Sequence, residues 1–235
     1  MRAFAKGSCI SLRLFFLVSD CAAQRTPIIQ SLHAQRGVEL STIPTSPFWR
    51  AAHPIYAESD KHGRALPKYR TDIRTRWTEK NIYFLFICPY NALYTKPAPN
   101  TDHETYELWN WNVAEVFIGS DFKDIKRYKE FEVSPHNEWV DLDIDLNKPH
   151  HEDGWLWNSG FEHVTRIDAA KHIWYVAIKI PFNAIDTRTP APGNTFRVNL
   201  YRTEGPPKES KEIMWQPVMS DTFHVPERFG LLRLK

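Results

Sequence analysis

The stretch WVDLDIDL, Trp139 to Leu146, alternates large apolar and acidic side chains along its length. Successive side chains of an extended strand point to opposite faces, so the valine, leucine and isoleucine share one face and the aspartates the other. The pattern predicts a strand with one face on a hydrophobic core and one face in water. Alternate positions lie about 6.5 to 7 Å apart, too far for a single calcium ion, so we expect a solvated acidic stripe. The stripe comprises Asp141, Asp143 and Asp145.

Similar alternation and short apolar runs recur to the end of the chain, whereas no helical period lasts beyond a turn or two. Arg74 to Trp77 and Ile82 to Ile87 flank the polar sequence TEKN, which predicts a hairpin. The other expected strands are Val113 to Ile118, Tyr128 to Val133, Trp139 to Ile144, Phe161 to Thr165, Trp174 to Ile180, Phe196 to Tyr201 and Gly230 to Leu234. Many one-faced strands in one domain predict an all-β fold, an antiparallel β-sandwich of the immunoglobulin or jelly-roll kind.

The N-terminal segments differ from this pattern. Residues 1–24 have a basic start, an apolar stretch and small residues at the end, which predicts an export signal and a secreted or periplasmic protein. Residues 25–40 are polar and are expected to be a linker or irregular segment before a single domain, residues 41–235. Without the signal only Cys88 remains, so no disulfide framework is possible. The longest later apolar run is about a third of the length that a membrane span needs.

Composition narrows the classes of function. The chain has nine Trp, nine Tyr and fourteen Phe, and aromatic rings serve both strands and the binding of flat ligands. A net charge of +2 without a basic run argues against nucleic acid as a partner. No nucleophile elbow, phosphate loop or HExxH motif is present, and no spacing singles out the acid pair of a glycoside hydrolase. The sequence favours binding over catalysis.

Six segments occur in a fixed order that resembles one family. They are LWNWNVAEVFIG, YKEFEVSPHNEWVDLDI, WYVAIKIPF, FRVNLYR, MWQP and FHVPERFGLLRL. The chain resembles the carbohydrate-binding module family 9-like domains over most of residues 40–235. The resemblance implies a β-sandwich related to the DOMON superfamily, found on exported polysaccharide-degrading proteins, with a mono-, oligo- or polysaccharide as its partner. It also implies a sugar held between two aromatic rings, and structural calcium as a possible cofactor.

The resemblance also implies particular site residues. Trp109 has the place of the first ring, with Glu115 at the family's spacing, and Phe223 in FHVPERFG has the place of the second. The apolar faces of a sugar pack on rings, whereas its hydroxyl groups need fixed polar partners. The other candidate residues are Asn112, Glu132, Asn199, Arg202, Trp215 and Asp221. The alternative for Trp109 is a lid over the sandwich, and the alternative for the polar strand residues is an exposed position without a ligand.

Two residues depart from the family pattern. Glu132 stands where binding members tend to have arginine, and Asn112 replaces the acid that precedes the family's glutamate. These changes affect both hydroxyl recognition and any calcium site. A domain associated with a glycoside hydrolase but without a ligand of its own is therefore an alternative.

Two further sets of residues could bind a cofactor or a metal. A haem-binding electron-transfer domain of the DOMON type would need axial ligands. Its candidates are Met214, Met219, His163 and His224. The sequence HHED, His150 to Asp153, could bind a metal, but adjacent loop residues rarely converge on one ion, so a solvated turn is favoured.

Overall fold

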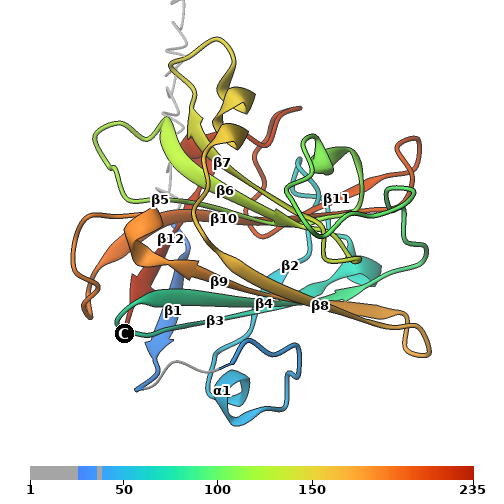
Figure 1. The fold of residues 1–235 in the computed structure, drawn as a ribbon, viewed down its shortest axis with the longest axis horizontal. Coiled ribbons are helices and arrows are strands. Elements are labelled where there is room, and N and C mark those ends of the chain that lie inside the picture. Colours follow the sequence, from blue (N-terminus) through green and yellow to red (C-terminus); the bar gives the residue numbers. More distant parts are fainter. Residues whose placement is uncertain (1–25, 36–38) are drawn as a thin grey trace, which may run out of the picture.

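The computed structural model describes residues 26–35 and 39–235, so the expected export signal lies outside the described residues. The described part is all-β (Figure 1). Its strands are β1 Ile28–His33, β2 Ile55–Ala57, β3 Thr71–Trp77, β4 Asn81–Pro89, β5 Ala114–Gly119, β6 Arg127–Val133, β7 Trp139–Asp145, β8 Glu162–Asp168, β9 Ile173–Pro181, β10 Thr195–Glu204, β11 Lys211–Met214 and β12 Gly230–Leu234. Its short helical segments are α1 Pro47–Arg50 and the 3-10 turns η1 Pro67–Tyr69, η2 Leu108–Asn110, η3 His151–Leu156, η4 Phe182–Ala184 and η5 Pro226–Arg228. No helix among the described residues is long and apolar enough to cross a membrane.

Every strand expected from the sequence is present. The expected hairpin is confirmed, because β3 and β4 pair antiparallel with Trp77 opposite Ile82. Three further strands, β1, β2 and β11, have no counterpart in the sequence prediction. Two of them are three- and four-residue strands, too short for alternation to stand out from the surrounding loop.

The strands form one curled mixed sheet in the order β7-β6-β5-β10-β12-β1-β3-β4-β9-β8, with β11 on β10 and β2 on β3. β1 joins the two halves: Ile28 to Ser31 run parallel to β12, and Leu32 and His33 run parallel to β3. The expectation of a purely antiparallel sandwich is therefore wrong at β1, which pairs parallel with both neighbours. The expectation of a linker or irregular segment is wrong for Ile28–His33, which form this strand. This strand is short and its buried face holds only Ile29 and Ser31, which is a weak apolar signal.

The main core lies between the two halves of the sheet, which Figure 1 shows as an upper layer with β5, β6 and β10 and a lower layer with β3, β4 and β9. Alternate residues of each strand point into it, as the sequence predicts for β9 and β10. Its buried members include Phe84, Phe86, Trp174, Val176, Val198 and Leu200. Burying a side chain of this size stabilises the fold by about 1.5 to 3 kcal/mol.

A second cluster covers the opposite face of β5, β6, β7 and β10 and contains Val140, Leu142, Ile144 and Leu146 of WVDLDIDL. Asp143 and Asp145 pair with Lys129 and Arg127, in agreement with a solvated stripe. Asp141 is buried instead, and its Oδ2 accepts a hydrogen bond from the Ser159 amide at 2.9 Å. The expectation of three solvated aspartates is therefore wrong for Asp141, because the segment after η3 folds back over β7.

A glycine allows η3 to approach β7 closely. A Cβ atom at Gly154 would lie 2.3 Å from the carbonyl oxygen of Asp143, well inside van der Waals contact. With η3 packed on β7, its first residues stand beside the second cluster. The loops around this face define the candidate site.

Candidate functional site

A pocket of about 630 Å³ opens over the second cluster, between η2, η3 and the loop that precedes η5. Its floor is the outer face of β5, β6 and β7. Its lining includes Tyr106, Trp109, Trp111, Asn112, Glu115, Phe117, Glu130, Glu132, Leu142, Ile144, His151, Glu152, Phe223 and His224. Two segments more than a hundred residues apart in sequence therefore meet at one opening.

Both rings that the resemblance singles out line this pocket. Trp109 lies half-buried in η2, and the Tyr106 ring packs edge-on against it at 5.4 Å. The Phe223 ring stacks on Tyr201 with centroids 4.8 Å apart and an interplanar angle of 17°. The Tyr201 hydroxyl accepts a hydrogen bond from Asn199 Nδ2 at 2.7 Å and donates one to the Phe223 carbonyl at 3.1 Å. A buried strand residue thus fixes the position of the second ring.

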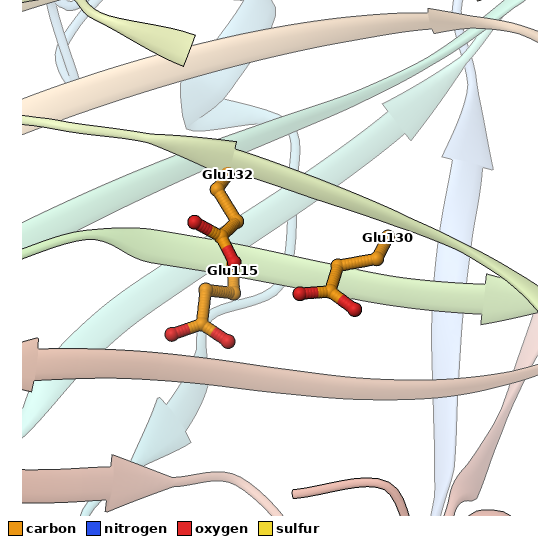
Figure 2. A group of neighbouring side chains, drawn as sticks. All are labelled: Glu115, Glu130 and Glu132. Atoms are coloured by element: carbon orange, nitrogen blue, oxygen red, sulfur yellow. The ribbon is translucent and has the colours of Figure 1, made fainter. Parts of the chain in front are cut away.

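Three glutamates form the deepest polar part of the pocket. Glu115 of β5 stands opposite Glu132 of β6 in the sheet register, and Glu130 lies two residues earlier on the same face of β6. Figure 2 shows their carboxylates side by side on these neighbouring strands. Among the described residues, they are the one group of three or more His, Cys, Asp or Glu side chains with ligand atoms all within 4.8 Å of one another.

Burial dominates the electrostatics of this cluster. It raises the pKa of Glu130 to about 7. Burial and then the neighbouring glutamates also raise the pKa values of Glu115 and Glu132. No lysine or arginine lines the pocket, and Lys61 pairs only with the acids at the rim, Glu212 and Asp221. The floor therefore carries acid groups without a cationic partner.

Two histidines, His151 and His224, also line the pocket. The ring of His224 forms a hydrogen bond at 2.6 Å with the Tyr128 hydroxyl through Nδ1, and it packs edge-on against His151 at 4.5 Å. Burial lowers the pKa of His224 to about 4. His224 is therefore neutral at neutral pH and offers a polar, uncharged edge.

The remaining candidates lie in different places. Asn112 lines the pocket and braces the loop above it, accepting a hydrogen bond from the Tyr94 amide at 2.7 Å. Asp221 lines the rim, with its side chain 95% exposed. Asn199 is fully buried and outside the lining, and it meets the site through Tyr201.

Arg202 and Trp215 are also outside the lining. Arg202 is fully buried between the two halves of the sheet, where its Nε donates to Thr71 Oγ1 at 2.7 Å. The alternative of an exposed position is wrong for Asn199 and Arg202, because both are fully buried. Arg202 follows Tyr201 on β10, so it points to the opposite face, away from the pocket. The Trp215 ring covers Gly230, where a Cβ atom would lie 2.3 Å from the indole.

The sequence prediction did not assign Tyr106, Glu130, His151, Glu152 or His224 to this pocket. For Glu130 a signal existed, since YKEFEV places it on the same strand face as Glu132. The predicted solvated turn HHED holds for His150 and Asp153, which are exposed, but His151 and Glu152 line the pocket. Of the haem-ligand candidates only His224 lines the pocket, whereas Met214 is buried in the second cluster and Met219 is exposed.

The chain is similar to known proteins. A relative named "Extracellular protein" from Arthroderma benhamiae is 26% identical over 147 residues, or 58% of this chain and 64% of the relative, so the match spans less than two thirds of that relative. Two solved structures of a carbohydrate binding module family 9 from Caldicellulosiruptor kristjanssonii, in complex with cellotriose and with glucose, are both 13% identical. Their TM-scores are 0.63 and 0.62, and the matches cover 89% and 88% of this chain and 94% and 95% of theirs. This likeness shows a shared fold.

The family assignment comes from the sequence match. The model of the carbohydrate family 9 binding domain-like family matches residues 45–235, which include both rings and the three glutamates. That range also agrees with the segment order that suggested the family. The chain belongs to the carbohydrate family 9 binding domain-like family.

Proposed function

We propose that this protein binds carbohydrate without transforming it, with a sugar ring held between Trp109 and Phe223. The single observation that carries the proposal is that these two rings, from distant segments, line one pocket together with fixed acid groups. Membership of the family supports it, as do the cellotriose and glucose complexes of the structural neighbours. A gluco-configured mono- or oligosaccharide is therefore the first ligand to test.

The chemistry of the pocket suits a sugar. The C–H faces of a pyranose are apolar and pack on indole and phenyl rings, and the hydroxyl groups at its edge need acceptors and donors. The carboxyl groups at the floor offer hydrogen-bond acceptors to hydroxyl groups, and Asn112 and Asp221 line the same pocket. Asn199 acts through Tyr201, as a positioning residue for Phe223.

A binding role is favoured over glycoside hydrolysis. A retaining glycosidase needs one ionised carboxylate as nucleophile, about 5 Å from an acid. Burial raises the pKa of each of the three glutamates at the floor, and no cationic residue of the pocket lining favours ionisation of one of them. Release of reducing sugar from glucans, lost on Glu115→Gln, would contradict this part of the proposal.

We also propose that the protein acts outside the cytoplasm, in the use of extracellular polysaccharide. The name of the Arthroderma benhamiae relative and the signal-like pattern of residues 1–24 support this. Mass spectrometry of the protein recovered from the culture medium tests it, with an expected N-terminus near residue 25.

The sugar proposal is tested by isothermal titration calorimetry with glucose, cellotriose and a panel of other oligosaccharides. A ring stacked on a sugar contributes about 1 to 2 kcal/mol, so Trp109→Ala and Phe223→Ala should each weaken binding about tenfold. Phe122→Ala is the matched control, because Phe122 is 48% exposed and lies outside the pocket lining. Equal loss of affinity in all three variants would count against the two-ring site.

A further inference from the structure

The three glutamates at the floor of the pocket are buried far more deeply than acids normally are. Glu115, Glu130 and Glu132 are 2%, 4% and 0% exposed. Four of their six carboxylate oxygens are inaccessible and have no hydrogen-bond partner among the described residues: Glu115 Oε1, Glu130 Oε2 and both oxygens of Glu132. A buried ionised carboxylate without a partner is strongly destabilising, so the ionised cluster is incomplete without one.

Within residues 26–35 and 39–235, no cationic side chain of the pocket lining supplies that partner. The pocket lining contains seven acidic residues and no lysine or arginine. Lys129 is next to Glu130 in sequence, but it points to the other face of β6 and pairs with Asp143 at 2.5 Å. A cation from outside the described part of the chain would satisfy these oxygens when the carboxyl groups are ionised.

The ligand atoms indicate the kind of cation. One carboxylate oxygen from each glutamate lies within 4.8 Å of the others, so the three oxygens can reach one ion. Calcium takes six to eight oxygen ligands in a flexible geometry, whereas magnesium needs a near-ideal octahedron at about 2.0 to 2.1 Å, and zinc prefers nitrogen and sulfur ligands.

We propose that Glu115, Glu130 and Glu132 bind a calcium ion at the floor of the pocket. The ion neutralises the adjacent carboxylates and satisfies the oxygens that have no partner in the protein. Three carboxylates leave part of the usual six- to eightfold coordination of calcium open. Water or sugar hydroxyl groups fill those positions. The coordination by sugar hydroxyl groups rests on the proposed function.

Isothermal titration calorimetry tests the site directly. The full chain is treated with EDTA, dialysed and titrated with calcium chloride without any sugar. We expect one calcium ion to bind per chain, and Glu132→Gln and Glu115→Gln each to weaken binding about tenfold or more. The control is Glu162→Gln, which removes an exposed glutamate of β8 and should leave calcium affinity unchanged. Circular dichroism shows whether each variant folds, and either cluster variant alone suffices for the comparison.

Two outcomes would overturn the proposal: no calcium binding by the wild-type protein, or equal calcium affinity in the wild type and the folded cluster variants. Magnesium binding as tight as calcium binding would overturn the assignment to calcium. Phe223→Ala keeps the calcium site separate from the sugar site, because it should lower sugar affinity and leave calcium affinity unchanged. Calcium binding without any sugar binding would overturn the proposed function and support the calcium site.

Discussion

Replacing Tyr201 by phenylalanine tests how the fold fixes the second ring of the pocket. The change removes one fully buried hydroxyl group and leaves the aromatic ring that stacks on Phe223. Two hydrogen bonds are lost, from Asn199 Nδ2 at 2.7 Å and to the Phe223 carbonyl at 3.1 Å. Asn199 Nδ2 still donates to the Gln216 carbonyl at 2.9 Å, so the Phe223 carbonyl is the group left without a partner.

The magnitude follows from these contacts. Each hydrogen bond contributes about 1 kcal/mol net, and a carbonyl left unpaired adds part of its desolvation cost, so we expect a loss of about 2 kcal/mol in the free energy of unfolding. For a chain of this size that lowers Tm by about 4 to 8 °C. Sugar affinity should fall a few-fold, because the backbone of Phe223 is no longer held.

Urea unfolding followed by tryptophan fluorescence measures the first effect, and calorimetric titration with the best oligosaccharide measures the second. Tyr83→Phe is the matched control, because the Tyr83 hydroxyl is buried and has no hydrogen-bond partner in the part of the chain that the structure describes. That variant should be neutral or slightly more stable. Equal stabilities of Tyr201→Phe and the wild type would refute the view that this hydroxyl anchors the site.

Three other changes follow from the structure. Burial lowers the pKa of His163 from 6.5 to about 4, so the unfolded chain takes up the proton first and stability falls as pH drops from 6.5 to 4. Urea unfolding should show that this loss in the free energy of unfolding is about 2 kcal/mol smaller in His163→Gln than in the wild type. Identical pH profiles of stability for the two proteins would contradict this expectation. Gly154→Ala adds a methyl group that meets the Asp143 carbonyl, and this overpacking should lower the free energy of unfolding by about 1 to 3 kcal/mol. Tm should therefore fall by several degrees, and an unchanged Tm would show that η3 shifts freely. Glu132→Gln should raise the Tm of calcium-free protein at alkaline pH, because it removes a buried charge without a cationic partner, and a lower Tm would contradict that.

Much of the fold was accessible from the sequence, because long strands with one buried face carry a period-two signal. β9 and β10 are examples, where Trp174, Val176, Val198 and Leu200 all point into the main core as predicted. β1 could not be predicted from the sequence, because its burial depends on the distant strands β3 and β12 rather than on its own composition. Asp141 was misplaced for a related reason: alternation gives the face of a residue, but only the packing of the Ser159 loop shows that this face is covered.

The site shows a similar division. The resemblance supplied Trp109 and Phe223, and both line one pocket. The glutamate cluster depends on the strand register that puts Glu115 opposite Glu132. The sequence of one strand alone does not predict its register with a neighbouring strand. Arg202 was misplaced because a polar residue on a strand is normally exposed, whereas here three hydrogen bonds hold it inside.

Sugar binding in this pocket requires the two rings to hold a sugar between them. A crystal structure of the protein with cellotriose would show whether they do. We expect a pyranose ring between Trp109 and Phe223, in van der Waals contact with both at about 4 Å, with its hydroxyl groups directed to the glutamate floor. Cellotriose bound elsewhere on the protein, or a pocket that stays free of sugar at saturating concentration, would contradict it.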